Sequence, residues 1–138
     1  MAKKCGSPSD VGTTGEHLVI EKLKSLSIKV QTQVETKTGA KTQTGKDARY
    51  LSDIVTDKWV LEIKTCARTG TPEKLGDAVH RLAITSESLH RRPFLVVLGA
   101  KYEFHIKNDA AFKRALRSEP NVVVFTYNEF IDFINENN

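Results

Sequence analysis

A continuous apolar run at residues 94–98 is the feature that most constrains how this chain can fold. A strand without a polar side is typical of the centre of a sheet that is covered on both faces. Residues 121–126 form a second run of this kind. Residues 58–65 alternate instead, which places Trp59, Leu61 and Ile63 on one side of a third strand. Helices from the rest of the chain must then cover the sheet.

Apolar residues recur at helical spacing in the segments between and around these strands. Four such segments are expected to form helices, at residues 15–27, 72–90, 109–117 and 128–135. Residues 51–55 complete a hairpin with 58–65 through the turn Thr56-Asp57-Lys58. The pattern predicts an α/β fold with a mixed central β-sheet flanked by helices.

A long polar segment interrupts this pattern early in the chain. Residues 28–34 alternate as a half-exposed strand, but residues 35–50 contain almost nothing apolar. We expect a long turn or a projecting hairpin there. Residues 1–13 are rich in Gly, Ser, Pro and Lys and are expected to form a flexible N-terminal tail, which leaves a single domain at residues 14–138.

Composition excludes some classes of protein and permits others. The 138 residues carry a net charge of +4, which permits contact with nucleic acid without requiring it. No apolar run is long enough to span a membrane, and the N-terminus lacks the apolar stretch of a secretory signal. Cys5 and Cys66 have no metal-ligand partners nearby in sequence, so we expect two free thiols in a reducing cytoplasm.

Asp53, Glu62 and Lys64 form the constellation most suited to chemistry. Glu62 and Lys64 are two residues apart on one strand, so they share a face, and a tight hairpin would bring Asp53 beside Glu62. Two adjacent carboxylates repel each other unless a hard cation such as Mg²⁺ lies between them. A lysine beside that cation can act on a water molecule and stabilise charge on phosphorus. The pattern therefore indicates phosphodiester hydrolysis, although a solvated charged face of a strand would give the same triplet.

With the helix that opens at Gly15-Glu16, these residues resemble the PD-(D/E)xK nuclease superfamily, which includes type II restriction endonucleases and Holliday junction resolvases. The resemblance covers about residues 15–98 and implies a restriction-endonuclease-like core of order α-β-β-β-α-β. Ser52 stands where the motif name has proline. The resemblance implies that Asp53, Glu62 and the Ile63 carbonyl bind Mg²⁺, for which Mn²⁺ can substitute. It also implies that Lys64 acts on the attacking water and that Glu16 lies at the edge of the site, on metal-bound water.

Two polar segments are candidates for contact with DNA. The segment at residues 35–50 interleaves basic residues with Thr and Gln, which suit phosphates and base edges respectively, although a solvated mobile loop would have the same composition. A Thr/Gly turn follows Lys64, and similarity to restriction endonucleases implies that it approaches the DNA backbone, whereas an ordinary helix cap is the alternative. The candidate residues are Lys37, Lys41, Thr42, Gln43, Lys46, Arg49, Arg68, Thr69 and Thr71.

The sequence thus predicts a Mg²⁺-dependent endodeoxyribonuclease, in the form of a restriction-type enzyme or its small catalytic subunit. A structure-selective nuclease, such as a junction resolvase or repair enzyme, is the second hypothesis, and a DNA-binding module without catalysis is a third. One active site per chain implies a homodimer or a larger partner subunit if both strands of double-stranded DNA are cut. The resemblance implies 5′-phosphate products.

Overall fold

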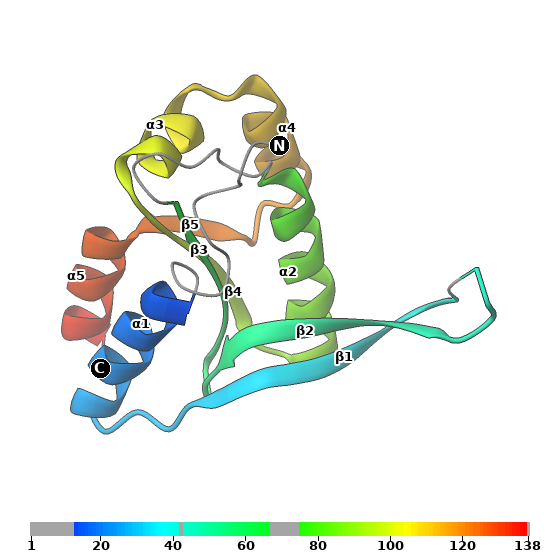
Figure 1. Cartoon of the computed structure of the whole chain (residues 1–138), viewed down its shortest axis with the longest axis horizontal. Helices are drawn as coiled ribbons and strands as arrows, with labels where there is room; N and C mark the ends of the chain where they lie inside the picture. The colour runs from blue at the N-terminus through cyan, green and yellow to red at the C-terminus, as the bar shows by residue number, and fades with distance from the viewer. Residues whose placement is uncertain (1–12, 42, 67–74, 138) are drawn as a thin grey trace.

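The computed structural model describes residues 13–41, 43–66 and 75–137 (Figure 1). The elements are α1 Thr13–Ser25, β1 Gln31–Lys41, β2 Asp47–Val55, β3 Trp59–Thr65, α2 Gly76–Leu89, β4 Arg92–Leu98, α3 Ala100–Asn108, α4 Ala110–Ser118, β5 Val123–Thr126 and α5 Tyr127–Asn137. The first six follow the order α-β-β-β-α-β. Among the described helices, none has the length and apolar character needed to cross a membrane.

A single five-stranded sheet has the spatial order β1-β2-β3-β4-β5. The pairs β1–β2 and β2–β3 are antiparallel, whereas β3–β4 and β4–β5 are parallel. The expected α/β fold with a mixed sheet is therefore confirmed. The central position of β4 is also confirmed, because its apolar run lies between β3 and β5 with Phe94, Leu95, Val96 and Val97 all fully buried.

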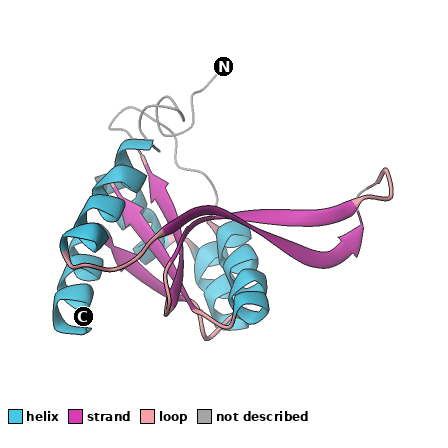
Figure 2. Ribbon diagram, turned by 90° about the horizontal axis from the view of Figure 1, so that it is seen from below, coloured by secondary structure: helices cyan, strands magenta, loops and turns pink. Residues whose placement is uncertain are grey.

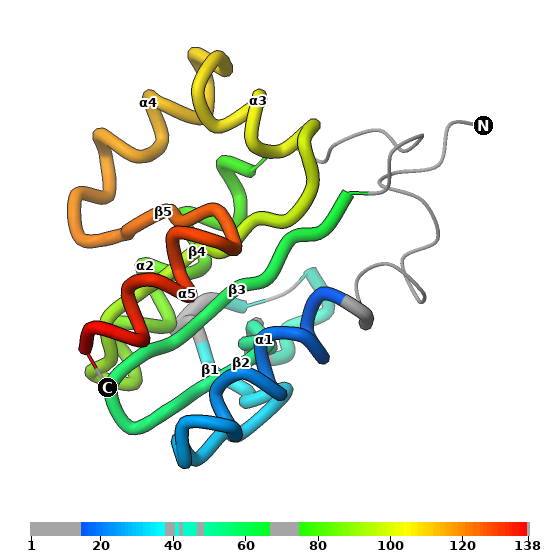
Figure 3. Tube along the Cα trace, turned by 90° about the vertical axis from the view of Figure 1, so that its left-hand side faces the viewer, coloured from blue at the N-terminus to red at the C-terminus, as the bar shows by residue number. Residues whose placement is uncertain are grey.

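Helices cover both faces of the sheet (Figure 3). Helices α1 and α5 pack on the face that carries Leu61 and Phe94. Helices α2, α3 and α4 pack on the opposite face, which carries Val60 and Leu95. The expected alternation along β3 is confirmed, since Trp59, Leu61 and Ile63 share one core and Val60 belongs to the other.

Strands β1 and β2 continue beyond the sheet as a two-stranded ribbon (Figures 1 and 2). Strand β2 pairs with β3 only at Ile54 and Val55, whereas its pairing with β1 continues out to Lys41 and Asp47. We call residues 35–51 the ribbon. Of the two expectations for this segment, the projecting hairpin is confirmed. The expected bounds of the first strand were wrong, because β1 begins at Gln31 and runs on to Lys41.

Four further features differ from the expectation or fall outside the described residues. Helix α3 was not expected, because only Tyr102 of its side chains is fully buried and its apolar spacing is weak. Strand β5 was expected to be buried, but it lies at the edge of the sheet and all four of its residues are half-buried. Helix α2 begins at Gly76, and its expected start at Thr71 and Pro72 lies outside the described residues. Residues 1–12 of the expected tail also lie outside them, whereas Thr13, expected to end the tail, begins α1.

Candidate active site

The site forms where β2 and β3 separate. Their hairpin is closed by Thr56, whose N–H donates to the Trp59 carbonyl at 2.9 Å and whose Oγ1 accepts from the Trp59 N–H at 3.0 Å. This turn sets a register in which Val55 pairs with Val60 and Ile54 with Leu61. The next pair in the same register would be Asp53 with Glu62, and the backbone ladder stops there.

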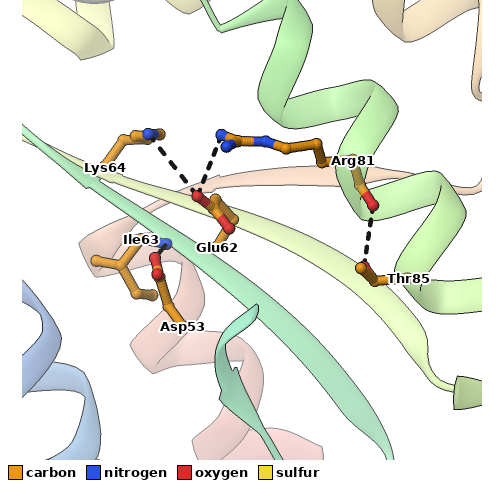
Figure 4. Close-up of polar contacts among 6 residues, drawn as sticks. All are labelled: Asp53, Glu62, Ile63, Lys64, Arg81 and Thr85. Carbon is orange, nitrogen blue, oxygen red and sulfur yellow. Dashed lines mark hydrogen bonds and ion pairs between the residues drawn. The ribbon is translucent and has the colours of Figure 1, made fainter. Parts of the chain in front are cut away.

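Asp53 takes over the hydrogen bond that β2 no longer provides. Its Oδ2 accepts from the Ile63 N–H at 2.8 Å (Figure 4). In an extended strand, the N–H and C=O of one residue point to the same neighbouring strand. The Ile63 carbonyl therefore faces the same edge of β3 as the Asp53 carboxylate, as the expected ligand set requires.

Glu62 lies beside Asp53 and is held by two cations. Its side chain is 11% exposed, and its Oε1 lies 3.7 Å from Lys64 Nζ and 3.4 Å from Arg81 Nη2. Figure 4 shows both cations directed at this one carboxylate, Lys64 from β3 and Arg81 from α2. The expected convergence of Asp53, Glu62 and Lys64 is therefore present. Arg81 belongs to the same charge cluster and was not predicted from the sequence.

Helix α1 brings Glu16 to the same charge cluster. The helix begins directly against the end of β3, where a Cβ on Gly15 would collide with Thr65 Oγ1. Glu16 follows and is half-buried. Burial, and secondarily the charge of Asp53, raises the pKa of the Glu16 carboxyl, while His17 and Lys64 act to lower it. Glu16 thus lies within electrostatic reach of both Asp53 and Lys64, as expected for a residue at the edge of the site.

Burial disfavours the ionised forms of the two central carboxylates. Burial, and secondarily the charge of Asp53, raises the pKa of Glu62 to about 7, although Lys64 and Arg81 act to lower it. Burial also raises the pKa of Asp53, in spite of the Ile63 hydrogen bond and the same two cations. A further positive charge between these carboxylates would therefore favour the ionised form of both.

These residues fit a hard divalent cation. Carboxylate and carbonyl oxygens are the ligands that Mg²⁺ prefers, and it commonly takes one or two carboxylates together with water and phosphate oxygens. Asp53, Glu62 and the Ile63 carbonyl supply oxygen atoms of these two kinds. Within the described residues, no three His, Cys, Asp or Glu side chains are grouped closely enough to hold an ion by themselves. Water or substrate oxygens would therefore have to complete the coordination.

The candidate DNA contacts divide between the ribbon and residues outside the described part. Four exposed basic residues lie on the ribbon, and Arg49 lies opposite Lys37 and pairs with Glu35. Gln43 is exposed in the turn that connects the two strands. The described basic members are Lys37, Lys41, Lys46 and Arg49. The candidates whose structure is not described are Thr42, Arg68, Thr69 and Thr71.

The raised pKa of Glu62 predicts a loss of stability as pH rises. The pKa of the unfolded carboxyl is near 4.5 and that of the folded one about 7, so the folded state holds the extra proton between these values. Unfolding free energy should therefore fall by about 3 kcal/mol between pH 5 and 9 in the absence of divalent cations. Denaturant unfolding of the wild type and Glu62→Gln at several pH values measures this difference. Glu87→Gln, at an exposed glutamate of α2, is the control, and parallel pH profiles for the wild type and Glu62→Gln would contradict the prediction.

Comparison with known proteins gives no assignment. No protein-family model, curated protein or solved structure matches the chain. Because one fold can support many activities, a function has to be argued from the chemistry of the site.

Proposed function

We propose that this chain is a Mg²⁺-dependent endodeoxyribonuclease that hydrolyses phosphodiester bonds at the point where β2 and β3 separate. One observation carries the proposal: two adjacent carboxylates, the half-buried Asp53 and the buried Glu62, lie beside Lys64 at the point where the strands separate. A solvated charged face of a strand, the alternative reading of this triplet, does not agree with a Glu62 side chain that is 11% exposed.

Each residue has a distinct part in this reaction. A bound Mg²⁺ would act as a Lewis acid on the phosphate and lower the pKa of a bound water. Asp53, Glu62 and the Ile63 carbonyl would hold the cation, and Asp53 is itself oriented by the Ile63 N–H at 2.8 Å. Lys64 lies 3.7 Å from Glu62, where its amine can orient the attacking water and balance charge that builds on phosphorus. Glu16 can accept a hydrogen bond from water at the edge of the site.

The ribbon supports double-stranded DNA as the substrate. A two-stranded β-ribbon fits the major groove, and basic side chains contact the phosphates that line it. The ribbon joins the sheet at Ser52, next to Asp53, so a DNA duplex held along the ribbon would approach the point where β2 and β3 separate. Its described charged side chains comprise four basic ones, Lys37, Lys41, Lys46 and Arg49, and one acidic one, Glu35.

The proposed enzyme is of the restriction type, with 5′-phosphate products. One chain offers one such site, so cleavage of both strands requires a homodimer or a larger partner subunit. A structure-selective nuclease would use the same three residues on a branched substrate.

A panel of substrates tests the proposal. The full chain is incubated with a supercoiled plasmid and with a four-way junction, in Mg²⁺ or in EDTA. Discrete linear fragments support a restriction enzyme, single nicks support a catalytic subunit that needs a partner, and symmetric junction cuts support a resolvase. DNA binding without cutting in Mg²⁺ or Mn²⁺ would contradict the proposed activity and leave a DNA-binding module.

A further inference from the structure

Arg81 enters the site from a different layer of the fold. It lies on α2, which covers the face of the sheet that carries Val60 and Leu95. Its Nη2 and Lys64 Nζ approach the same oxygen of Glu62, at 3.4 Å and 3.7 Å (Figure 4). The Arg81 side chain is 38% exposed against 11% for Glu62. The Arg81 guanidinium therefore contacts the buried Glu62 carboxylate, while the Arg81 side chain remains partly open to solvent.

The helix holds Arg81 in this position. Val79 and Leu82, its close neighbours on α2, are buried against the sheet. One turn later, Thr85 Oγ1 donates to the Arg81 carbonyl at 3.0 Å. A guanidinium carries five N–H donors, and although the Nε of Arg81 is buried without a hydrogen-bond partner, the side chain as a whole is 38% exposed, which leaves it within reach of a ligand.

We propose that Arg81 binds a phosphate of the DNA substrate, and that its contact with Glu62 keeps it in place until the substrate arrives. This inference rests on the proposed nuclease function. When Glu62 ligates a cation, its Oε1 offers Arg81 less negative charge, and the guanidinium can donate to phosphate oxygens instead. Arginine suits this exchange because its planar fork of donors matches phosphate oxygens in pairs.

A purely structural role for Arg81 makes a different prediction. If the guanidinium only neutralises Glu62, its removal should lower the stability of the fold and leave the affinity for DNA unchanged. If it binds a phosphate, its removal should weaken DNA binding and make that binding less sensitive to salt. The variant would neutralise one phosphate fewer, so fewer counterions would be released on binding. The salt dependence of DNA affinity therefore separates the two roles.

The experiment measures DNA affinity at several salt concentrations in Mg²⁺, with Lys64→Ala present in every protein so that DNA stays intact. Arg81→Gln is expected to weaken binding about tenfold and to reduce the slope of log K against log salt by about 1. Arg81→Lys should keep the slope, because it keeps the charge. With Lys64 restored, Arg81→Lys should cut more slowly than the wild type, because the planar fork is lost. Arg114→Gln, at an exposed arginine of α4, is the matched control and should change neither affinity nor slope.

Two outcomes would overturn the inference. If the wild type cuts DNA and Arg81→Gln keeps the full affinity and slope, Arg81 is only a structural counter-ion and the nuclease function stands. If the wild type neither binds nor cuts DNA in Mg²⁺, the proposed function and this inference fail together.

Discussion

Asp53→Asn and Lys64→Ala should each reduce DNA cleavage by roughly 10³-fold or more. Asp53→Asn removes one of the two negative ligands but keeps an oxygen that can accept the Ile63 N–H. Lys64→Ala removes the ammonium that lies 3.7 Å from Glu62. Asp53→Asn keeps the size of the side chain and should unfold at a temperature close to that of the wild type. Lys64→Ala should still fold but unfold at a somewhat lower temperature, because it removes a side chain that is only 19% exposed and that lies beside Glu62.

Single-turnover cleavage of plasmid DNA in Mg²⁺ measures the effect, and thermal unfolding checks the fold. The hairpin supplies matched controls, since Asp57 and Lys58 are exposed in the turn between β2 and β3. Asp57→Asn and Lys58→Ala make the same chemical changes within a few residues and should cut like the wild type. Cleavage at the wild-type rate by either Asp53→Asn or Lys64→Ala would discard the site.

Neutralising the ribbon should have the second-largest effect. A variant with Gln at Lys37, Lys41, Lys46 and Arg49 loses the described basic side chains of the ribbon and keeps its backbone pairing. If these side chains contact phosphates, affinity should fall roughly 10²- to 10³-fold at about 0.15 M salt, and the slope of log K against log salt should fall by up to about 4.

The control for this variant changes net charge by the same amount elsewhere. Gln at Lys107, Lys113, Arg114 and Arg117 neutralises four exposed basic residues on α3 and α4. Fluorescence anisotropy with a labelled duplex compares the two proteins across salt concentrations. Equal losses in both variants would mean that the ribbon contributes only to net charge and makes no specific contact with DNA.

The sequence predicted the centre of the fold because local patterns define it. The turn at Thr56 and the alternation in β3 both depend on residues within a few positions of each other. Together they fix the hairpin register, and the register brings Asp53 beside Glu62. The convergence of these two acids, which are separated along the chain, therefore follows from short-range signals alone.

The missed features depend on contacts that no local pattern encodes. Arg81 borders the buried face of α2, but its pairing with Glu62 depends on how that helix lies across β3. Helix α3 has a weak apolar pattern, with Tyr102 fully buried and Phe104 69% exposed, so periodicity does not reveal it.

Strand composition misled the prediction at one edge of the sheet and left two alternatives open at the other. The apolar run at β5 resembles that of β4, yet β5 lies at an edge and is only half-buried. The ribbon has few apolar residues, yet it is paired along most of its length, because backbone hydrogen bonds do not require apolar side chains. Whether a strand is central or at an edge depends on which elements cover it.

Binding of Mn²⁺ tests the central claim most directly, namely that Asp53 and Glu62 hold a hard cation. Electron paramagnetic resonance measures free Mn²⁺ during a titration of the full chain at pH 8, which lies above the Glu62 pKa of about 7. We predict saturable Mn²⁺ binding by the wild type, competition by Mg²⁺, and loss of this binding in Asp53→Asn but not in Asp57→Asn. Equal free Mn²⁺ for the wild type and Asp53→Asn throughout the titration would contradict the account.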